Sequence, residues 1–295
     1  MMERAARQGT EHAVLDSLPS GNPLGGRTVM GKRIASYSEK GGVGKSATAA
    51  GMVAAARKRR LDGTAGTVYA ADLDPRGTLT SELGINAPAF TMNDLLAMDP
   101  KGERGLAAEA LTDASEDWSG VRVIAAERAL ANREADQATG FEFRLRHALD
   151  GVLGEDDDLI FDLPPRAGGK LVTAALLAAT HVIIPATLNE DGRIGAEEAM
   201  ETIEIIRDSY GHDLQVVAIV PSIVPGGRTT LADAIGKQLA ATYGDLYRDD
   251  LAIPRHTLRE QTRYACVPVT SQTGREAAAL SAAYDSILTA AGATK

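Results

Sequence analysis

The residues best suited to chemistry form one glycine-rich stretch, Glu39-Lys40-Gly41-Gly42-Val43-Gly44-Lys45-Ser46. Glycines let the backbone curl so that successive N–H groups point inward at a phosphate, and a following helix N-terminus adds partial positive charge. In this pattern Lys45 reaches the β- and γ-phosphates, and the Ser46 hydroxyl ligates Mg²⁺. The usual pattern begins with glycine, but that position here holds Glu39, directly followed by a second lysine, Lys40. The stretch predicts a phosphate-binding loop of unusual form.

Two later stretches supply carboxylates. Ala71-Asp72-Leu73-Asp74-Pro75-Arg76-Gly77 follows one apolar run, and Asp162-Leu163-Pro164-Pro165 ends another. Aspartates at a strand end can simply cap turns, but oxygen donors beside a phosphate-binding loop are what Mg²⁺ requires. We therefore predict that Asp162 holds a magnesium-bound water and that Asp72 and Asp74 lie beside the phosphates.

These residues must be positioned by alternating strands and helices, which occupy residues 33 to about 291. Such alternation predicts an α/β fold with a single doubly wound, mainly parallel sheet that has helices on both faces, and ligands in such sheets sit at the carboxyl ends of strands. We predict strands at Arg33–Ser38, Thr67–Asp72, Val121–Ala125, Asp158–Asp162, His181–Pro185, Leu214–Pro221 and near Leu246–Ile253, and helices at Lys45–Arg59, Ala167–Ala179, Gly195–Ser209, Thr230–Tyr243 and Gly274–Ala290. Residues 33–295 then form one domain, and residues 1–32, with scattered charges and several Pro and Gly, a flexible N-terminal arm.

The composition excludes several classes of protein. A net charge of -9 argues against a surface coated in positive potential, so any nucleic-acid contact must come from a local patch. The single cysteine, Cys266, rules out an intrachain disulfide framework and any cluster that needs several thiolates from one chain. No apolar run approaches the roughly 18 residues of a membrane span, and the first thirty residues lack the apolar core of a secretory signal. We expect a soluble, cytoplasmic protein.

Lys-Gly-Gly-Val-Gly-Lys-Ser, followed by Asp72-Leu73-Asp74-Pro75 and by Asp162-Leu163-Pro164-Pro165, resembles the ParA/MinD family of deviant Walker-A ATPases, which are P-loop NTPases. Ile253-Pro254-Arg255 looks like the late signature of that family near the adenine pocket. The resemblance covers roughly residues 33–291. It departs from the family at position 76, where Arg76 replaces the usual glutamine, and at position 258, where Leu258 replaces an arginine that contacts DNA in many relatives.

The resemblance implies a mechanism. Lys40 reaches across a homodimer interface to the partner's ATP, Lys45 holds the phosphates, and Asp74 positions the attacking water. Magnesium is held by Ser46 and Asp162, with Asp72 in support, and the segment after Asp162 senses the γ-phosphate. The implied nucleotide contacts are Gly41, Gly42, Val43, Gly44, Lys45, Ser46, Ala47 and Pro254. A water poised by one carboxylate predicts slow basal turnover that a partner accelerates.

Cysteine content and the C-terminal segment distinguish the branches of the family. Reductase-like relatives need paired cysteines, and MinD-like relatives need an amphipathic C-terminal helix with bulky apolar residues, whereas Arg275 to Lys295 is Ala-rich and nearly uncharged. The DNA-partition branch remains, and its dimers bind DNA nonspecifically through basic residues. The candidate DNA contacts are Arg228, Arg255, Arg259 and Arg263, the last three at four-residue spacing, although a solvated helix face would look the same.

These features together predict a nucleoid-associated partition ATPase of plasmids or chromosomes. Its ATP-bound sandwich dimer would coat DNA until a ParB-type centromere-binding partner triggers hydrolysis. Two alternatives stay open: a MinD-like positioning ATPase, and a metabolic ligase resembling the dethiobiotin or cobyrinate amidation enzymes, which share the fold and the loop.

Overall fold

The computed structural model describes residues 31–97 and 104–293. Residues 1–30 of the predicted N-terminal arm lie outside the described residues. Lys32, assigned to the arm, instead begins the first strand.

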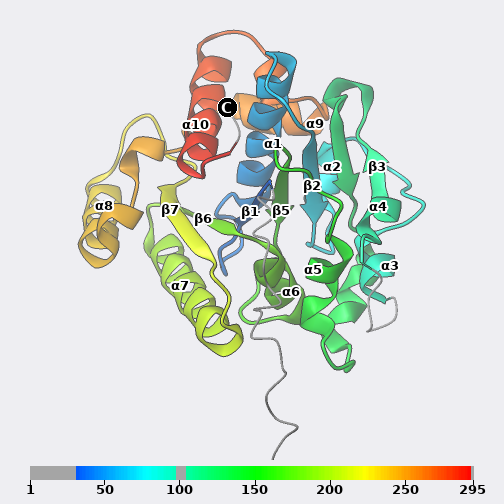
Figure 1. The fold of residues 1–295 in the computed structure, drawn as a ribbon. Coiled ribbons are helices and arrows are strands. Elements are labelled where there is room, and N and C mark those ends of the chain that lie inside the picture. Colours follow the sequence, from blue (N-terminus) through cyan, green and yellow to red (C-terminus); the bar gives the residue numbers. More distant parts are fainter. Residues whose placement is uncertain (1–30, 98–103, 294–295) are drawn as a thin grey trace, which may run out of the picture.

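In the described residues, seven strands form one sheet in the order β3-β4-β2-β5-β1-β6-β7 (Figure 1). Neighbouring strands are parallel except β3 and β4, which are antiparallel. The predicted mainly parallel sheet is therefore confirmed. The strands are β1 Lys32–Ser36, β2 Val68–Asp72, β3 Leu111–Asp113, β4 Val121–Ile124, β5 Asp158–Asp162, β6 His181–Ala186 and β7 Gln215–Pro221.

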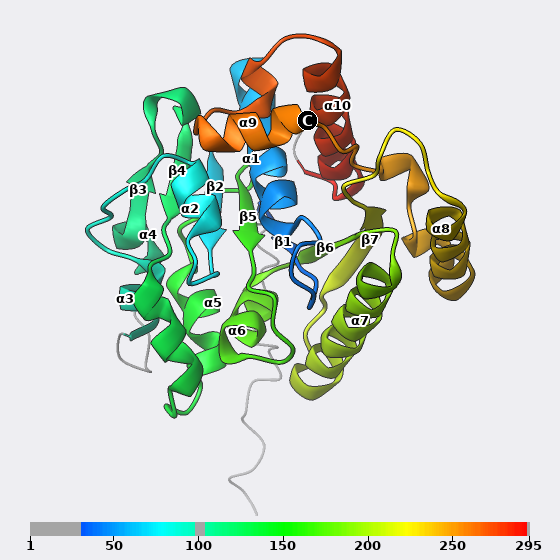
Figure 2. The same ribbon diagram turned by 180° about the vertical axis from the view of Figure 1, so that it is seen from behind.

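Helices cover both faces of this sheet. Figures 1 and 2 show α1 and α10 on one side and α5, α6 and α7 on the other. Each side has its own apolar cluster, because strands covered on both faces must point apolar side chains both ways. The helices are α1 Lys45–Leu61, α2 Thr78–Glu82, α3 Met92–Ala97, α4 Ala107–Ala110, α5 Arg144–Ala148, α6 Lys170–Ala178, α7 Glu190–Tyr210, α8 Thr230–Tyr243, α9 Thr257–Tyr264 and α10 Arg275–Ala290. Within the described part of the chain, no helix is both long and apolar enough to span a membrane.

The predicted strand near Leu246–Ile253 is wrong. Two single turns of 3₁₀-helix, Gly244–Leu246 and Asp249–Leu251, occupy this segment, and a lone bridge joins Tyr247 to β7. Arg248 and Asp250 pair with each other on the surface, so the segment lacks a continuous apolar face to add to the sheet. The short antiparallel strand β3 was not predicted, because three residues at a sheet edge, none of them buried, carry little apolar pattern.

Small side chains bring α1 and α10 close together. The inner face of α1 is mostly alanine, and at Gly51 the backbone lies directly against the ring of Tyr284 from α10. Leu280, Tyr284, Ile287 and Leu288 are all buried on α10, as predicted for a helix that packs on the core. This packing fixes the helix that begins at the phosphate-binding loop.

Gly51→Ala tests that contact. A Cβ atom at position 51 would lie 2.3 Å from two ring atoms of the fully buried Tyr284. Alanine normally favours a helix interior over glycine, but here we expect overpacking to win and to destabilise the fold by about 1–3 kcal/mol. Thermal unfolding should show a lower Tm, and Tyr284→Leu in the same chain should recover part of the loss. A Tm equal to or above that of the wild type would show that the helices do not need this close approach.

Candidate nucleotide site

The register of the sheet assembles the site. Asp162 at the end of β5 lies opposite Asp72 at the end of β2 and opposite Ser36 at the end of β1. These strands are parallel neighbours, so the loops that follow them leave the sheet at one edge. The predicted phosphate-binding loop and both predicted carboxylate stretches therefore meet at one place.

The loop between β1 and α1 has the curled form that its glycines predict. Gly42 and Gly44 adopt φ values of 79° and 87°, a region in which side chains are strained. Two hydroxyls brace the loop: Ser36 donates to the Lys45 carbonyl at 3.0 Å, and Ser222 donates to the Val43 carbonyl at 2.6 Å. Val43 is buried while Gly41 and Gly42 are exposed, and α1 begins at Lys45.

Glu39, which stands where the usual pattern has glycine, anchors this loop to its surroundings. Its Oε1 accepts hydrogen bonds from the Tyr37 hydroxyl at 3.0 Å and from the Thr202 hydroxyl of α7 at 2.5 Å. The residue that departs from the usual pattern thus has a structural role: Glu39 ties the start of the loop to α7.

Lys45 is nearly buried, and its ammonium donates to the Lys40 carbonyl at 2.7 Å. Burial lowers its pKa to about 8, although the charges of Asp162 and Asp74 oppose this shift. A polyphosphate placed on the loop would bring further negative charge close to this ammonium and so stabilise its charged form.

The two carboxylates at the strand ends differ in how they are satisfied. Asp72 accepts from the Asp74 amide at 3.0 Å and from the amide and hydroxyl of Thr80 at 2.9 and 2.8 Å. Asp162 is fully buried, and neither of its oxygens has a partner in hydrogen-bond geometry. Burial and the charge of Asp72 raise the pKa of Asp162 well above its usual value, and the nearby Ser46 hydroxyl and Lys45 only partly offset this. Thr80 was not singled out from the sequence.

An unpaired buried carboxylate beside a serine hydroxyl fits a hard, oxygen-seeking cation such as Mg²⁺. Ser46 and Asp162 would hold the ion directly or through its waters, and Asp72, already saturated by Thr80 and the Asp74 amide, would support them from behind. No three His, Cys, Asp or Glu side chains among the described residues form a metal site by themselves. This arrangement suits an ion that arrives with phosphate oxygens of its own.

Asp74 faces the same edge, and its carboxylate is held by Arg76. The Arg76 guanidinium donates from Nε to Oδ1 and Oδ2 at 3.2 and 3.1 Å and from Nη2 to Oδ2 at 2.7 Å. The Arg76 amide adds a bond to Oδ1 at 3.0 Å. Asp74 is almost completely buried, whereas the Arg76 side chain is 64% exposed.

Lys40 points away from the loop toward α7. Its ammonium lies 3.2 Å from a carboxylate oxygen of Glu198, and both side chains are about one-third exposed, at 34% and 38%. Gly195 makes room for it, since a Cβ atom there would lie 2.6 Å from Lys40 Cγ. Lys40 does not line the cavity described next.

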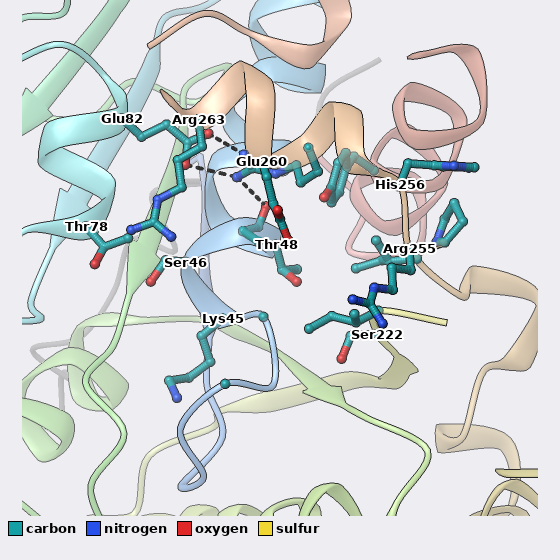
Figure 3. A pocket seen from close by; sticks show the side chains of 18 of the residues that line it. Lys45, Ser46, Thr48, Thr78, Glu82, Ser222, Arg255, His256, Glu260 and Arg263 are labelled. Atoms are coloured by element: carbon teal, nitrogen blue, oxygen red, sulfur yellow. Dashed lines mark hydrogen bonds and ion pairs between the residues drawn. The ribbon is translucent and has the colours of Figure 1, made fainter. Parts of the chain in front are cut away.

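A cavity of about 390 Å³ runs from the loop to α9 (Figure 3). Gly42, Gly44, Lys45, Ser46 and Ala47 of the loop line it, and Ile253 and Pro254 of the late signature line it as well. Ile223, which also lines the cavity, has φ 54°, a strained conformation of the kind that concentrates at functional sites. A cavity lined by both apolar and cationic side chains suits a nucleotide.

The four predicted DNA contacts do not form one surface patch. Arg255 and Arg263 line the nucleotide cavity. Arg228 lies outside it and pairs with Asp249 at 2.6 Å.

The structure places Arg259 differently from the solvent-facing position that its helical spacing predicted. Its side chain is nearly buried, forms a two-bonded ion pair with the buried Glu82 of α2 at 2.8 and 3.0 Å, and donates to the Ala47 carbonyl at 3.3 Å. A helical spacing of arginines could not reveal Glu82, which lies 177 residues away along the chain. Arg259 therefore joins α2, α9 and the start of α1 beside the cavity.

Comparisons with known proteins agree with this geometry. Residues 31–216 match a family described as an AAA domain. The chain is 31% identical to the chromosome-partitioning ATPase Soj of Thermus thermophilus, over 72% of this chain and 78% of that protein. It is 30% identical to the chromosome partitioning protein ParA of Myxococcus xanthus, over 66% of each.

Solved structures share the fold. McdA of Cyanothece in complex with ATP superimposes with a TM-score of 0.74 at 18% identity, over 90% of this chain and 98% of that one. Cobyrinic acid a,c-diamide synthase of Mycobacterium smegmatis, with an ATP analogue and magnesium bound, gives a TM-score of 0.67 at 26% identity, over 88% and 94%.

The pKa of Lys45 makes ATP affinity depend on pH. In the free protein this pKa is about 8, and a bound triphosphate favours the ammonium, so binding above pH 8 must take up a proton. We expect the affinity for Mg-ATP to fall by about tenfold per pH unit between pH 8 and 10. Calorimetry in buffers of different ionisation enthalpy would measure both the affinity and the proton uptake. Lys45→Arg is the control, because arginine stays charged, and a flat wild-type profile up to pH 10 would contradict the assignment.

Asp162→Asn separates stability from function. The raised pKa of Asp162 means that its ionisation costs folding stability, so this contribution worsens as pH rises from about 4 through the folded-state pKa. At neutral pH we expect the ligand-free variant to be more stable than wild type, with a Tm higher by roughly 2–4 °C per kcal/mol gained, and to lose magnesium-dependent ATP hydrolysis. Asp113→Asn, at an aspartate that is 89% exposed, should change neither property. A drop in Tm at position 162 would mean that Asp162 is satisfied without a cation.

Proposed function

This chain belongs to the ParA/MinD family of ATPases, and we propose that within the family it is a partition ATPase that switches between an ATP-bound dimer on DNA and a released form. Hydrolysis of ATP is the activity of that family. The switch, the DNA and the partner are the proposal. The names of the Thermus and Myxococcus relatives, both chromosome-partitioning proteins, support it.

The observation that carries the proposal is the position of Lys40. A second lysine in a phosphate-binding loop has no use for its own nucleotide if its ammonium points away from the cavity and toward Glu198 on α7. With its side chain one-third exposed, Lys40 can exchange Glu198 for a phosphate presented by a second subunit. We infer that two chains meet face to face at this edge, each completing the other's site.

Different residues of the chain have different roles in ATP hydrolysis. The amides of Gly42 to Ser46 and the Lys45 ammonium bind the β- and γ-phosphates and neutralise their charge. Asp74 accepts a hydrogen bond from the attacking water and holds it in line with the γ-phosphorus. Ser46 and Asp162 would hold Mg²⁺, which would supply positive charge to the phosphate oxygens. The Pro164–Gly169 segment follows Asp162 directly, and we propose that it changes conformation when the γ-phosphate leaves.

DNA binding in this proposal needs the dimer. The net charge of -9 gives a single subunit no general attraction for DNA. Arg228 remains a candidate contact, because its ion pair with Asp249 is on the surface and can be exchanged for a phosphate. Two copies of such a weak contact, fixed in one dimer, bind far more tightly than either alone.

The cobyrinic acid a,c-diamide synthase similarity favours a second candidate, an ATP-dependent amide-forming ligase. Both candidates use the same phosphate loop and magnesium residues, so the loop cannot separate them. Assembly separates them, because only a switch must dimerise with ATP and dissociate with ADP. A MinD-like role is less favoured, because the apolar side of α10 is buried against α1 rather than left for a membrane.

The proposal predicts ATP-dependent dimerisation and DNA binding that Lys40→Ala abolishes. Light scattering and DNA co-sedimentation with ATP, ADP and no nucleotide would measure both. Asp74→Ala should bind ATP, dimerise and stay on DNA, because hydrolysis is blocked. Lys40→Ala should bind ATP as a monomer, whereas Lys58→Ala, at an exposed lysine on α1, should behave as wild type. A wild-type protein that binds ATP but keeps one assembly state in every nucleotide would instead favour the ligase.

A further inference from the structure

We propose that Arg76 is a γ-phosphate ligand supplied by the chain itself, held on Asp74 until ATP arrives. This inference rests on the proposed function, in which Asp74 positions the attacking water. It gives a role to the residue at which this sequence departs from its family.

In the free protein Arg76 occupies the carboxylate that hydrolysis needs. Both oxygens of Asp74 accept from its guanidinium, at 2.7 to 3.2 Å, and one accepts from its amide as well. A carboxylate engaged by this fork has few lone pairs left for a water molecule. The resting contact is therefore incompatible with full use of Asp74 as a water acceptor.

The two partners differ in their freedom to move. Asp74 is 4% exposed, whereas Arg76 is 64% exposed at the same ion pair. If the pair separates, the arginine side chain must be the part that leaves. Solvent can replace the contacts that the exposed arginine loses. The buried carboxylate then needs another donor, which in this proposal is the attacking water.

Arg76 already stands beside the place where the γ-phosphate would lie. It lines the nucleotide cavity together with Lys45, Ser46 and Thr78, and its charge is close enough to lower the pKa of Lys45. It also borders a second cavity of about 780 Å³, lined by residues of the Asn86–Thr91 loop and by Glu127 and Arg128. The side chain thus has open space on both sides of its present position.

A triphosphate changes the competition for this guanidinium. The γ-phosphate offers more charge and more acceptor oxygens than one carboxylate, in the planar two-bonded geometry that arginine prefers. Transfer of the Arg76 guanidinium to the γ-phosphate adds a cation where charge develops. It frees Oδ2 of Asp74 and leaves Oδ1 with the Arg76 amide alone. ADP lacks the γ-phosphate, so it leaves the resting pair intact.

The chemical step then balances without any further group. The oxygen of a water held by Asp74 bonds to the γ-phosphorus, and the bond from that phosphorus to the β–γ bridging oxygen breaks. ADP departs with the electron pair, and the water's proton ends on inorganic phosphate. P-loop enzymes that carry such an arginine in the same chain still turn over at only about 10⁻² s⁻¹, so the role is compatible with slow hydrolysis.

Arg76→Gln and Arg76→Lys test the proposal in the full-length chain. We expect Arg76→Gln to weaken binding of a non-hydrolysable ATP analogue by about tenfold and leave ADP binding unchanged. Its kcat should fall by about 10³-fold, and Arg76→Lys should recover part of both losses, as a point charge without the fork. Arg128→Gln removes the same charge from an exposed site on the second cavity only, and should match wild type.

Two results would overturn the inference. An unchanged ratio of ATP-analogue to ADP affinity with unchanged kcat would leave Arg76 as a surface residue. A raised kcat with an unchanged ratio would make it a clamp on Asp74 and nothing more. Failure of the wild type itself to bind or hydrolyse ATP would count against the proposed function rather than against Arg76.

Discussion

The structure depends on a set of ionisable groups buried at one edge of the sheet. Asp72 and Asp162 are opposite each other on adjacent parallel strands and wholly inaccessible, with Asp74 and Lys45 almost as deeply buried beside them. Burying like charges together raises their pKa values and costs folding stability unless a counter-charge is present. Lys45 supplies part of that counter-charge, and Mg²⁺ would supply a further part. The site is thus destabilised until its ligands bind, which is the usual relation between stability and activity at a functional site.

The three cationic side chains proposed to contact phosphate each have an internal partner in the ligand-free protein. Lys40 contacts Glu198, Lys45 contacts the Lys40 carbonyl, and Arg76 contacts Asp74. Binding must exchange these contacts for phosphate contacts, so part of the binding energy goes into rearrangement of the site. In the proposed function, a protein arranged in this way responds to the difference between ATP and ADP, because the exchange at Arg76 needs the γ-phosphate. That property suits a switch better than a rapid catalyst.

The sequence alone was sufficient for the parts of the site that are local in the chain. Glycine, lysine and serine at fixed spacing predict the loop, and aspartates after apolar runs predict the carboxyl edge, because each depends only on neighbouring residues. Contacts between distant segments left no local signal. The Glu82–Arg259 ion pair, the hydroxyl of Thr80 behind Asp72, and the fit of Lys40 over Gly195 all join segments far apart in sequence. Arg255, Arg259 and Arg263 do not all lie on one helix, because α9 begins only at Thr257. Within α9, Arg259 faces Glu82 instead of solvent.

The placement of these arginines changes where DNA affinity must come from. Arg255, Arg259 and Arg263 all line the nucleotide cavity, with Arg259 also paired to Glu82, and Arg228 and Arg248 are paired with Asp249 and Asp250. A subunit with this distribution and a net charge of -9 has little long-range attraction for DNA. In the proposed function, ATP must therefore supply the affinity by bringing two weak surfaces together in one dimer, because it creates no strongly basic face on either subunit. Loss of the dimer after hydrolysis would then be enough to release DNA, with no need for a large change within a subunit.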